Sequence, residues 1–215
     1  MALISTHTPC TGIGRLRALA RPSVVAAMIV SMLCILVQWQ AESLYAVLRY
    51  ERDAVLAGQW WRLWTNGLCH LGWSHLWLNL ATLGIIIALF FESMSRASQL
   101  TLYGVTFGAV GVGVLAFNPE ITGYVGISGA LQGLLLVGAT LAWRDGERVR
   151  PIAVWLYLAV KLGFEQSHGA LPTSSWLTHG MVAVDAHFYG FLGGLFWLGM
   201  AALALGVRRR AGSQR

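Results

Sequence analysis

Long apolar segments with almost no charge are the feature of this sequence that most restricts its fold. Most of them are close in length to the about 20 residues that an α-helix needs to cross a bilayer core of about 30 Å. Only segments that satisfy their own backbone polar groups persist in lipid, which favours helices. We therefore expect an all-α polytopic membrane protein with six transmembrane helices, at about 23–39, 74–91, 98–117, 127–143, 151–164 and 182–205.

The composition agrees with a membrane domain over residues 23–205, flanked by tails at 1–22 and 206–215. Of the 215 residues, 56% are hydrophobic and 11% are charged, whereas soluble domains carry about 25% charge. Intrinsic disorder and a disulfide-rich secreted scaffold are therefore disfavoured. Three cysteines, Cys10, Cys34 and Cys69, show no metal-type spacing, and we interpret them as small apolar residues.

The basic residues predict the orientation in the bilayer. Eleven of the fifteen Lys and Arg residues fall on one side if six spans are crossed, and this side is the cytoplasm by the positive-inside rule. Both termini are then cytoplasmic, and the longer connections, 40–73 and 165–181, face outward. The net charge of +6 lies at helix ends and not on one face, so we expect the lipid bilayer and not nucleic acid as a partner. The first connection contains four indoles, Trp60, Trp61, Trp64 and Trp73, which is typical of an interfacial segment.

Polar residues inside the predicted spans are the first candidates for function, because an unpaired polar side chain is costly in hydrocarbon. These residues are His75, Asn79, Ser128 and His187. Counting back along each helix at about 1.5 Å per residue places His75, Ser128 and His187 roughly 22 to 27 Å above the inner boundary. Three different helices thus place polar groups at the same height.

Glycines predict how two of these helices approach each other. Gly129 and Gly133 share one face of the fourth span, and Gly190 and Gly194 share the His187 face of the sixth. Small residues at this spacing allow helix backbones to come close in membranes. If the two faces meet, His187 approaches Ser128, and a Ser hydroxyl within about 3 Å of an imidazole is an activated nucleophile with His as the general base.

Other polar residues extend this hypothesis. His75 and Asn79 lie one helical turn apart and can donate hydrogen bonds above Ser128, near a helix N-terminus that favours negative charge, so they predict an oxyanion hole. Asp185 is two positions from His187, about 200° around the helix, and cannot orient it directly; the hypothesis does not require a third, carboxylate member.

Two further observations concern a pair of charged residues and the prospect of a bound metal. Lys161 and Glu165 are four residues apart and could pair or snorkel, and a role in substrate docking stays open. An HExxH motif is absent, which disfavours a zinc protease. We expect neither a metal nor any other cofactor.

Three motifs, in this order, resemble those of the rhomboid intramembrane serine proteases: GQWWRLWTNGLCHLGWSHLWLN, GISGALQG and AHFYGFLGG. The resemblance covers about residues 58–205 and implies a six-helix rhomboid-like bundle. It implies that Ser128 of the GxSG motif is the nucleophile and that His187 of the AHxxG motif is the general base. It also implies that His75 and Asn79 help to hold the oxyanion, and that His70 and the Trp61–Arg62 pair are structural.

Within this family, SGALQGLLLVGA, KLGFEQ and VAVDAH are similar to the rhombosortase branch. Gln132 departs from the family pattern, because His is expected there in many members. The branch implies a multi-pass enzyme of the bacterial inner membrane whose active site opens to the periplasm. Its expected substrates are secreted or surface proteins with a C-terminal sorting signal made of Gly-Gly, an apolar helix and a basic tail. Periodicity and spacing do not show this substrate class.

Two alternatives to an intramembrane serine endopeptidase remain. One is a non-catalytic rhomboid-like protein that binds membrane helices, which is disfavoured because both Ser128 and His187 are present. The other is a small transporter. It would need intramembrane charges or inverted repeats, and the second to fourth spans have no charge at mid-depth and no evident internal symmetry.

Overall fold

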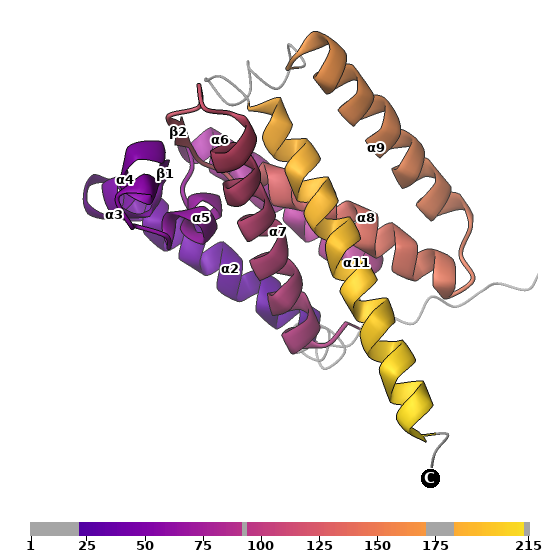
Figure 1. Cartoon of the computed structure of the whole chain (residues 1–215). Helices are drawn as coiled ribbons and strands as arrows, with labels where there is room; N and C mark the ends of the chain where they lie inside the picture. Colours follow the sequence, from indigo (N-terminus) through magenta and orange to yellow (C-terminus); the bar gives the residue numbers. More distant parts are fainter. Residues whose placement is uncertain (1–21, 92–93, 171–182, 213–215) are drawn as a thin grey trace, which may run out of the picture.

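The computed structural model describes residues 22–91, 94–170 and 183–212, which form a bundle of long helices with a cap of short elements on one side (Figure 1). Each of the six segments predicted to span the membrane corresponds to one long helix. The long helices are α2 (Pro22–Trp39), α6 (Trp73–Phe90), α7 (Arg96–Phe117), α8 (Ser128–Arg144), α9 (Val149–His168) and α11 (Val184–Gly212).

Four of these helices are long and apolar enough to cross a membrane: α2, α6, α7 and residues Val184–Leu205 of α11. The other two long helices, α8 and α9, do not meet this criterion of length and apolar composition. Helix α8 has 17 residues, and α9 carries Arg150, Lys161 and Glu165. The predicted count of six crossings therefore stays a prediction.

Two helices extend beyond the approximate boundaries that the sequence predicted. The fifth span was expected to end at residue 164 and to be followed by a loop over 165–181, but α9 continues to His168, so Glu165 is helical. Residues 171–182 of that predicted loop lie outside the described residues. The tail expected at 206–215 begins as a continuation of α11, which extends past the other helices to Gly212 (Figure 1). Most of the tail predicted at 1–22 also lies outside the described part.

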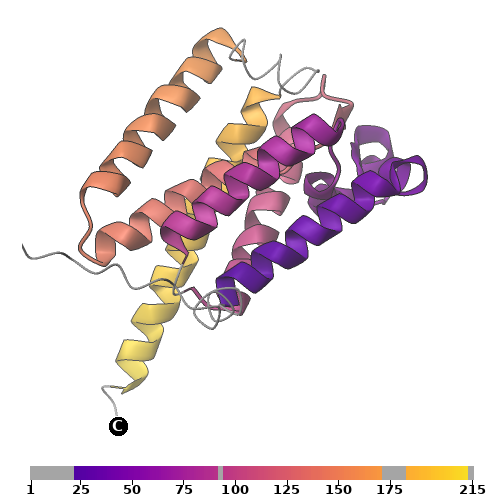
Figure 2. The same ribbon diagram turned by 180° about the vertical axis from the view of Figure 1, so that it is seen from behind.

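The bundle core is built on close contact between α8 and α11. A Cβ added to Gly129 would lie 2.6 Å from the carbonyl oxygen of Ala186, and one added to Gly194 would lie 2.7 Å from that of Gly133. Such distances leave no room for a side chain, so the two helices touch backbone to backbone. The predicted approach of the glycine faces is confirmed. Seen from behind, α6 runs in front of this pair, α2 lies beside α6 in front of α7, and α9 stands at one edge (Figure 2).

The first long connection is a folded cap and not a simple loop. It comprises α3 (Ala41–Leu48), β1 (Tyr50–Glu51), α4 (Arg52–Leu56), α5 (Arg62–Thr65) and the 3₁₀ turn η1 (Asn66–Leu68). Arg62 is buried in it and donates from Nη1 to the carbonyl oxygen of Arg49 at 2.8 Å. Strand β1 pairs antiparallel with β2 (Gly123–Tyr124), with Tyr50 opposite Tyr124. The cap is thus attached to the segment that leads into α8.

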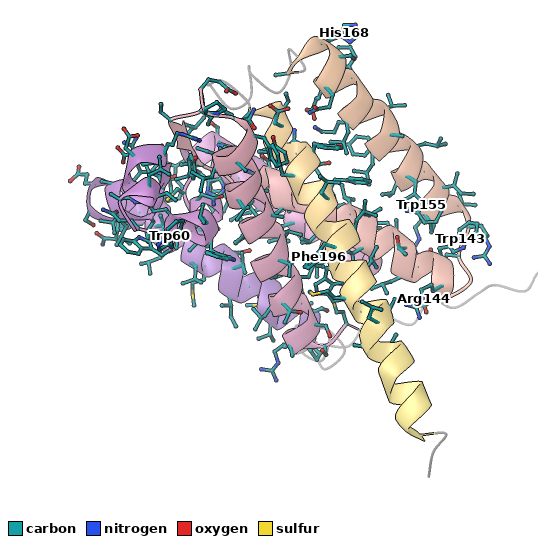
Figure 3. All side chains as sticks on the ribbon, in the orientation of Figure 1. Trp60, Trp143, Arg144, Trp155, His168 and Phe196 are labelled. Carbon is teal, nitrogen blue, oxygen red and sulfur yellow. The ribbon has the colours of Figure 1, made fainter. Side chains whose placement is uncertain are left out.

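The tryptophans of this cap are exposed, as an interfacial segment requires. Trp60, Trp61, Trp64 and Trp73 are between 42% and 55% exposed. Trp60 lies on the outer side of the cap, far from the Trp143–Trp155 pair near the α8–α9 connection (Figure 3). The exposed indoles of the cap and the half-buried Trp143 and Trp155 suit the headgroup region of a bilayer.

Candidate active site

Ser128 and His187 face each other where α8 and α11 begin. Ser128 is the first residue of α8, and Gly126 just before it has φ of +118°, a conformation that a side chain would strain. The Gly126 N–H donates to the carbonyl oxygen of Asn66 at 3.1 Å, which ties this turn to the cap. His187 lies in the first turn of α11, and its Nε2 is 3.2 Å from Oγ of Ser128. The two side chains are within hydrogen-bond distance.

His75 and Asn79 lie on α6 beside the same turn. Nδ1 of His75 accepts the Leu71 N–H at 3.4 Å, which leaves Nε2 as the protonated nitrogen of the neutral ring. A Cβ on Gly126 would lie 3.2 Å from that Nε2 and 3.9 Å from Nδ2 of Asn79. Nδ2 of Asn79 is buried and has no hydrogen-bond partner among the described residues. Two donors therefore stand close to the Ser128 turn, and Nδ2 of Asn79 has no acceptor in the described part of the chain.

These four residues line one cavity of about 430 Å³. Ligand sites combine mostly apolar walls with a few convergent polar groups, and this cavity has both. Leu78 of α6 and Tyr157 of α9 belong to its lining and are partly exposed, at 40% and 49%. The cavity is therefore bordered by α6 and α9 at the surface of the bundle.

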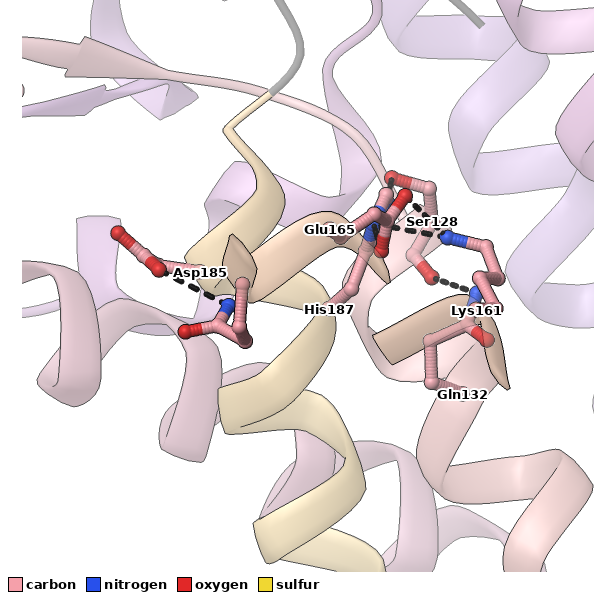
Figure 4. A network of polar contacts seen from close by, with 7 residues as sticks. Ser128, Gln132, Lys161, Glu165, Asp185 and His187 are labelled. Atoms are coloured by element: carbon pink, nitrogen blue, oxygen red, sulfur yellow. Dashed lines mark hydrogen bonds and ion pairs between the residues drawn. The ribbon is translucent and has the colours of Figure 1, made fainter. Parts of the chain in front are cut away.

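Glu165 is a member of the site that sequence reasoning missed. Its side chain is fully buried, and its Oε2 lies 2.9 Å from Nδ1 of His187 (Figure 4). Its Oε1 accepts a hydrogen bond from Nζ of Lys161, so these two residues pair, which was one of the possibilities left open by the sequence. The separation of 22 residues between Glu165 and His187 gave no periodic signal, and the predicted end of the fifth span at 164 had placed Glu165 in a loop.

Asp185 does not contact the imidazole, as the helix geometry predicted. It accepts hydrogen bonds from Nδ2 of Asn118 at 2.7 Å and from Nε2 of Gln166 at 3.0 Å. Asp185 thereby joins the first turn of α11 to α7 and α9. Asp185 therefore connects helices beside the site and makes no contact with the imidazole of His187.

Gln132 lies one turn below Ser128, as predicted, and lines the cavity. Its Nε2 donates to the carbonyl oxygen of Ser128 at 3.3 Å, while its Oε1 is buried and has no partner in the described part of the chain. This amide therefore adds a free acceptor to the cavity floor.

His70 and Cys69, which precede α6, are poorly suited to act as an acid, a base or a nucleophile. His70 is buried, with its ring centroid 5.1 Å from that of His75, and burial, then the neighbouring His75, lower the pKa of His70 to about 3. Burial likewise raises the pKa of the Cys69 thiol to about 12. Residues 22–91, 94–170 and 183–212 contain no group of three His, Cys, Asp or Glu residues that could hold a metal ion.

Comparison with known proteins identifies the family. The model of the Rhomboid domain matches residues 57–203, well over half of the chain. The chain is also similar to a protein of Bacillus subtilis (strain 168) named "Putative rhomboid protease YdcA", with 27% identity over 146 residues. That alignment covers 65% of this chain and 66% of the relative's length. Together with its apolar helices, the match over residues 57–203 shows that this multi-pass membrane protein belongs to the rhomboid family.

Proposed function

We propose that this protein is an intramembrane serine endopeptidase in which Ser128 and His187 act as a catalytic dyad. The observation that carries the proposal is the 3.2 Å distance between Oγ of Ser128 and Nε2 of His187. The serine alone would be a weak nucleophile, and an adjacent base is what activates it. The similarity to a protein named as a rhomboid protease supports the same activity.

The acylation step needs only residues of this site. Oγ of Ser128 attacks the carbonyl carbon of the scissile peptide, Nε2 of His187 takes the hydroxyl proton, and the carbonyl electron pair moves to oxygen. When the C–N bond breaks, the same proton passes from Nε2 to the leaving amine. Water then attacks the acyl-enzyme with His187 again acting as the base, and Ser128 is regenerated.

The free donors of His75 and Asn79 stabilise the oxyanion of this reaction. Nε2–H of His75 and Nδ2–H of Asn79 lie beside the turn that carries Ser128. Ser128 is also at the N-terminus of α8, where unpaired N–H groups and the helix dipole favour negative charge. Donors fixed before the reaction are worth more than water, since they need not reorganise.

The decisive experiment is labelling with a serine-reactive fluorophosphonate or isocoumarin probe, with Ser128→Ala as the matched variant. We expect covalent labelling and cleavage of a membrane-anchored protein by the wild type, and neither by Ser128→Ala. Labelling or cleavage that persists in Ser128→Ala would refute the mechanism. A wild type that binds substrate helices but reacts with no probe would instead support the non-catalytic alternative.

For the substrate, we propose C-terminal membrane anchors preceded by Gly-Gly, on secreted or surface proteins of a bacterium. A peptide bond within a helix must be unwound before a nucleophile reaches it, and each Gly costs a helix about 1 kcal/mol relative to Ala. Glycine also has no side chain to collide with the wall that Gly123, Tyr124 and Val125 form beside Ser128. The enzyme would lie in the inner membrane with both termini cytoplasmic and the cavity open to the periplasm.

This specificity is tested by cleavage of an anchored reporter protein that ends in Gly-Gly, an apolar helix and an Arg-rich tail. We expect cleavage near the glycines and release from the membrane, both dependent on Ser128. The control substrate replaces both glycines by Leu. Undiminished Ser128-dependent cleavage of this control at the same place would refute the specificity and leave the protease assignment standing.

A further inference from the structure

The buried carboxylate of Glu165 is the polar group of the site that the two-residue mechanism leaves unused. Helix α9 is otherwise poorly covered, with Val160 71% exposed and Phe164 39% exposed. Glu165, in contrast, has a side chain that is 0% exposed. Burying a carboxylate is expensive unless it is paired and hydrogen-bonded, so its partners indicate its role.

Glu165 has two partners in the described residues, one on each oxygen. Oε1 accepts from Nζ of Lys161, and Oε2 lies 2.9 Å from Nδ1 of His187 (Figure 4). Lys161 precedes Glu165 by four residues on α9, and this order of charges is the less favourable one for stabilising a helix. The pair is therefore poorly explained as a helix-stabilising ion pair alone.

The position of the ring proton on His187 decides what the second contact does. Nζ of Lys161 also lies 3.1 Å from Nδ1 of His187. A carboxylate only accepts hydrogen bonds and an ammonium only donates them. If Nδ1 carries the proton, it donates to Glu165 and leaves Nε2 free to take the Ser128 proton. If Nδ1 is bare, it accepts from Lys161, and Nε2 carries the proton and cannot act as the base.

We propose that Glu165 is a positioning residue that completes a Ser128–His187–Glu165 triad, and that Lys161 holds its carboxylate in place. This inference rests on the proposed protease function. Glu165 binds the Nδ1–H of His187, fixes the ring in the tautomer that can act as a base, and faces the imidazolium that forms when Ser128 loses its proton. Glu165 is not protonated at any step. Lys161 neutralises the charge of the carboxylate. Because its N–H groups donate to Glu165, they do not donate to Nδ1 of His187.

The triad predicts an order of activities. Glu165→Gln should lower kcat on the order of 100- to 10,000-fold, since loss of the corresponding carboxylate in a serine-protease triad costs about 10,000-fold. KM should stay within about threefold, because the contact is made with His187 and not with substrate. Glu165→Asp keeps a carboxylate and should retain more activity than Glu165→Gln.

The Lys161 variants separate this role from a structural ion pair. In Glu165→Gln the ammonium is left beside Nδ1 and favours the inactive tautomer, so Lys161→Met added to Glu165→Gln should raise kcat above that of the single Glu165→Gln variant. It should not restore the wild-type rate, because His187 still lacks its carboxylate. Lys161→Met alone keeps the carboxylate and should lower kcat less than Glu165→Gln.

A matched control is Asp185→Asn. It removes a second carboxylate that joins α11 to α9, through Gln166, but makes no contact with His187. Its kcat should stay within about fivefold of the wild type, far from the loss expected of a triad carboxylate. All rates are measured per folded enzyme, on detergent-solubilised full-length protein, by cleavage of an anchored substrate and by the rate of fluorophosphonate labelling of Ser128.

Three outcomes would overturn the inference. They are a kcat of Glu165→Gln close to that of the wild type, full recovery in the double variant, or a change confined to KM, which would indicate substrate docking by Lys161 and Glu165. If Glu165→Gln does not fold, Glu165→Asp and the double variant, which leaves no unpaired buried charge, decide the question. Failure of the wild type to cleave or to be labelled would refute the proposed protease function itself, and normal wild-type activity with unaffected Glu165 variants would refute only the triad.

Discussion

The polar side chains beside Ser128 have few hydrogen-bond partners among the described residues. Nδ2 of Asn79 is buried with no acceptor among the described residues, while the ring of His75 is oriented by the N–H of Leu71. In the proposed mechanism both side chains face the charge that develops on the oxyanion. A donor that is unpaired at rest is costly, and the proposed oxyanion would offset this cost when it forms beside it.

The dyad should behave as a unit. Ser128→Ala and His187→Ala should each abolish turnover, and the double variant should be no worse than either one, because the nucleophile and its base act in the same step. Turnover is measured on an anchored substrate in detergent or liposomes. Additive losses in the double variant would show that the two side chains act independently.

Loss of an oxyanion donor should have a smaller effect. Asn79→Ala should reduce kcat on the order of 10- to 1000-fold, the upper part being typical of a preorganised donor. Thr82→Ala is the matched control, since Thr82 lines the same cavity but its hydroxyl already donates to the carbonyl oxygen of Leu78. Equal losses in the two variants would mean that Asn79 has no particular role.

Helix α11 positions His187 through its contact with α8. Gly190 and Gly194 follow His187 by three and seven residues and lie on the backbone of α8, where added Cβ atoms would meet the carbonyl groups of Gly129 and Gly133. Such contact lets van der Waals packing hold two helices together in lipid, where no hydrophobic force draws them together. The distance from His187 to Ser128 thus depends on residues that take no part in the chemistry.

Gly194→Leu tests this dependence. The larger side chain should push α11 from α8 and displace His187 by more than the roughly 1 Å that can cost about 100-fold in rate. Gly199→Leu is the matched control on the same helix, because a Cβ at Gly199 would meet no atom of the described residues within 4 Å. Unimpaired cleavage by Gly194→Leu, or an equal loss in Gly199→Leu, would contradict this explanation.

The molecule as a whole has two different ends. The cap formed by α3 to η1 and the paired strands lies at the end where α6, α8 and α11 begin, and the cavity lies at this end too. In the described residues, Arg96, Arg144, Arg148 and Arg150 lie at the opposite end, where α6 and α8 end and α7 and α9 begin. This asymmetry supports a bilayer orientation with the cavity facing away from the cytoplasm.

Reporter fusions measure this orientation. A reporter that is active only outside the cytoplasm should be silent when fused after Arg215 and active when fused within residues 167–178, since the basic residues keep their side of the protein in the cytoplasm. A reporter active only inside the cytoplasm provides the reciprocal control. The reverse pattern would place the cavity on the cytoplasmic face.

The sequence by itself determined the class of fold and pointed to the residues of the proposed dyad. Apolar segments of membrane-spanning length dictate helices, because lipid offers the backbone no other partner. Depth along each helix follows from a constant rise per residue, and the glycine spacing in α8 and α11 marked the faces that meet. Local patterns alone could therefore predict that Ser128, His187, His75 and Asn79 lie close together, and the structure places all four in the lining of one cavity.

Tertiary structure alone decided what depends on distant contacts. The cap over residues 41–68 is held by bonds such as Arg62 to the carbonyl of Arg49 and by the pairing of Tyr50 with Tyr124, which no local periodicity predicts. The same holds for Glu165. Its distance to His187 is set by the rotation of α9 about its axis and by one further helical turn past residue 164, and both are fixed by packing against α8 and α11 and not by the spacing of residues along the chain.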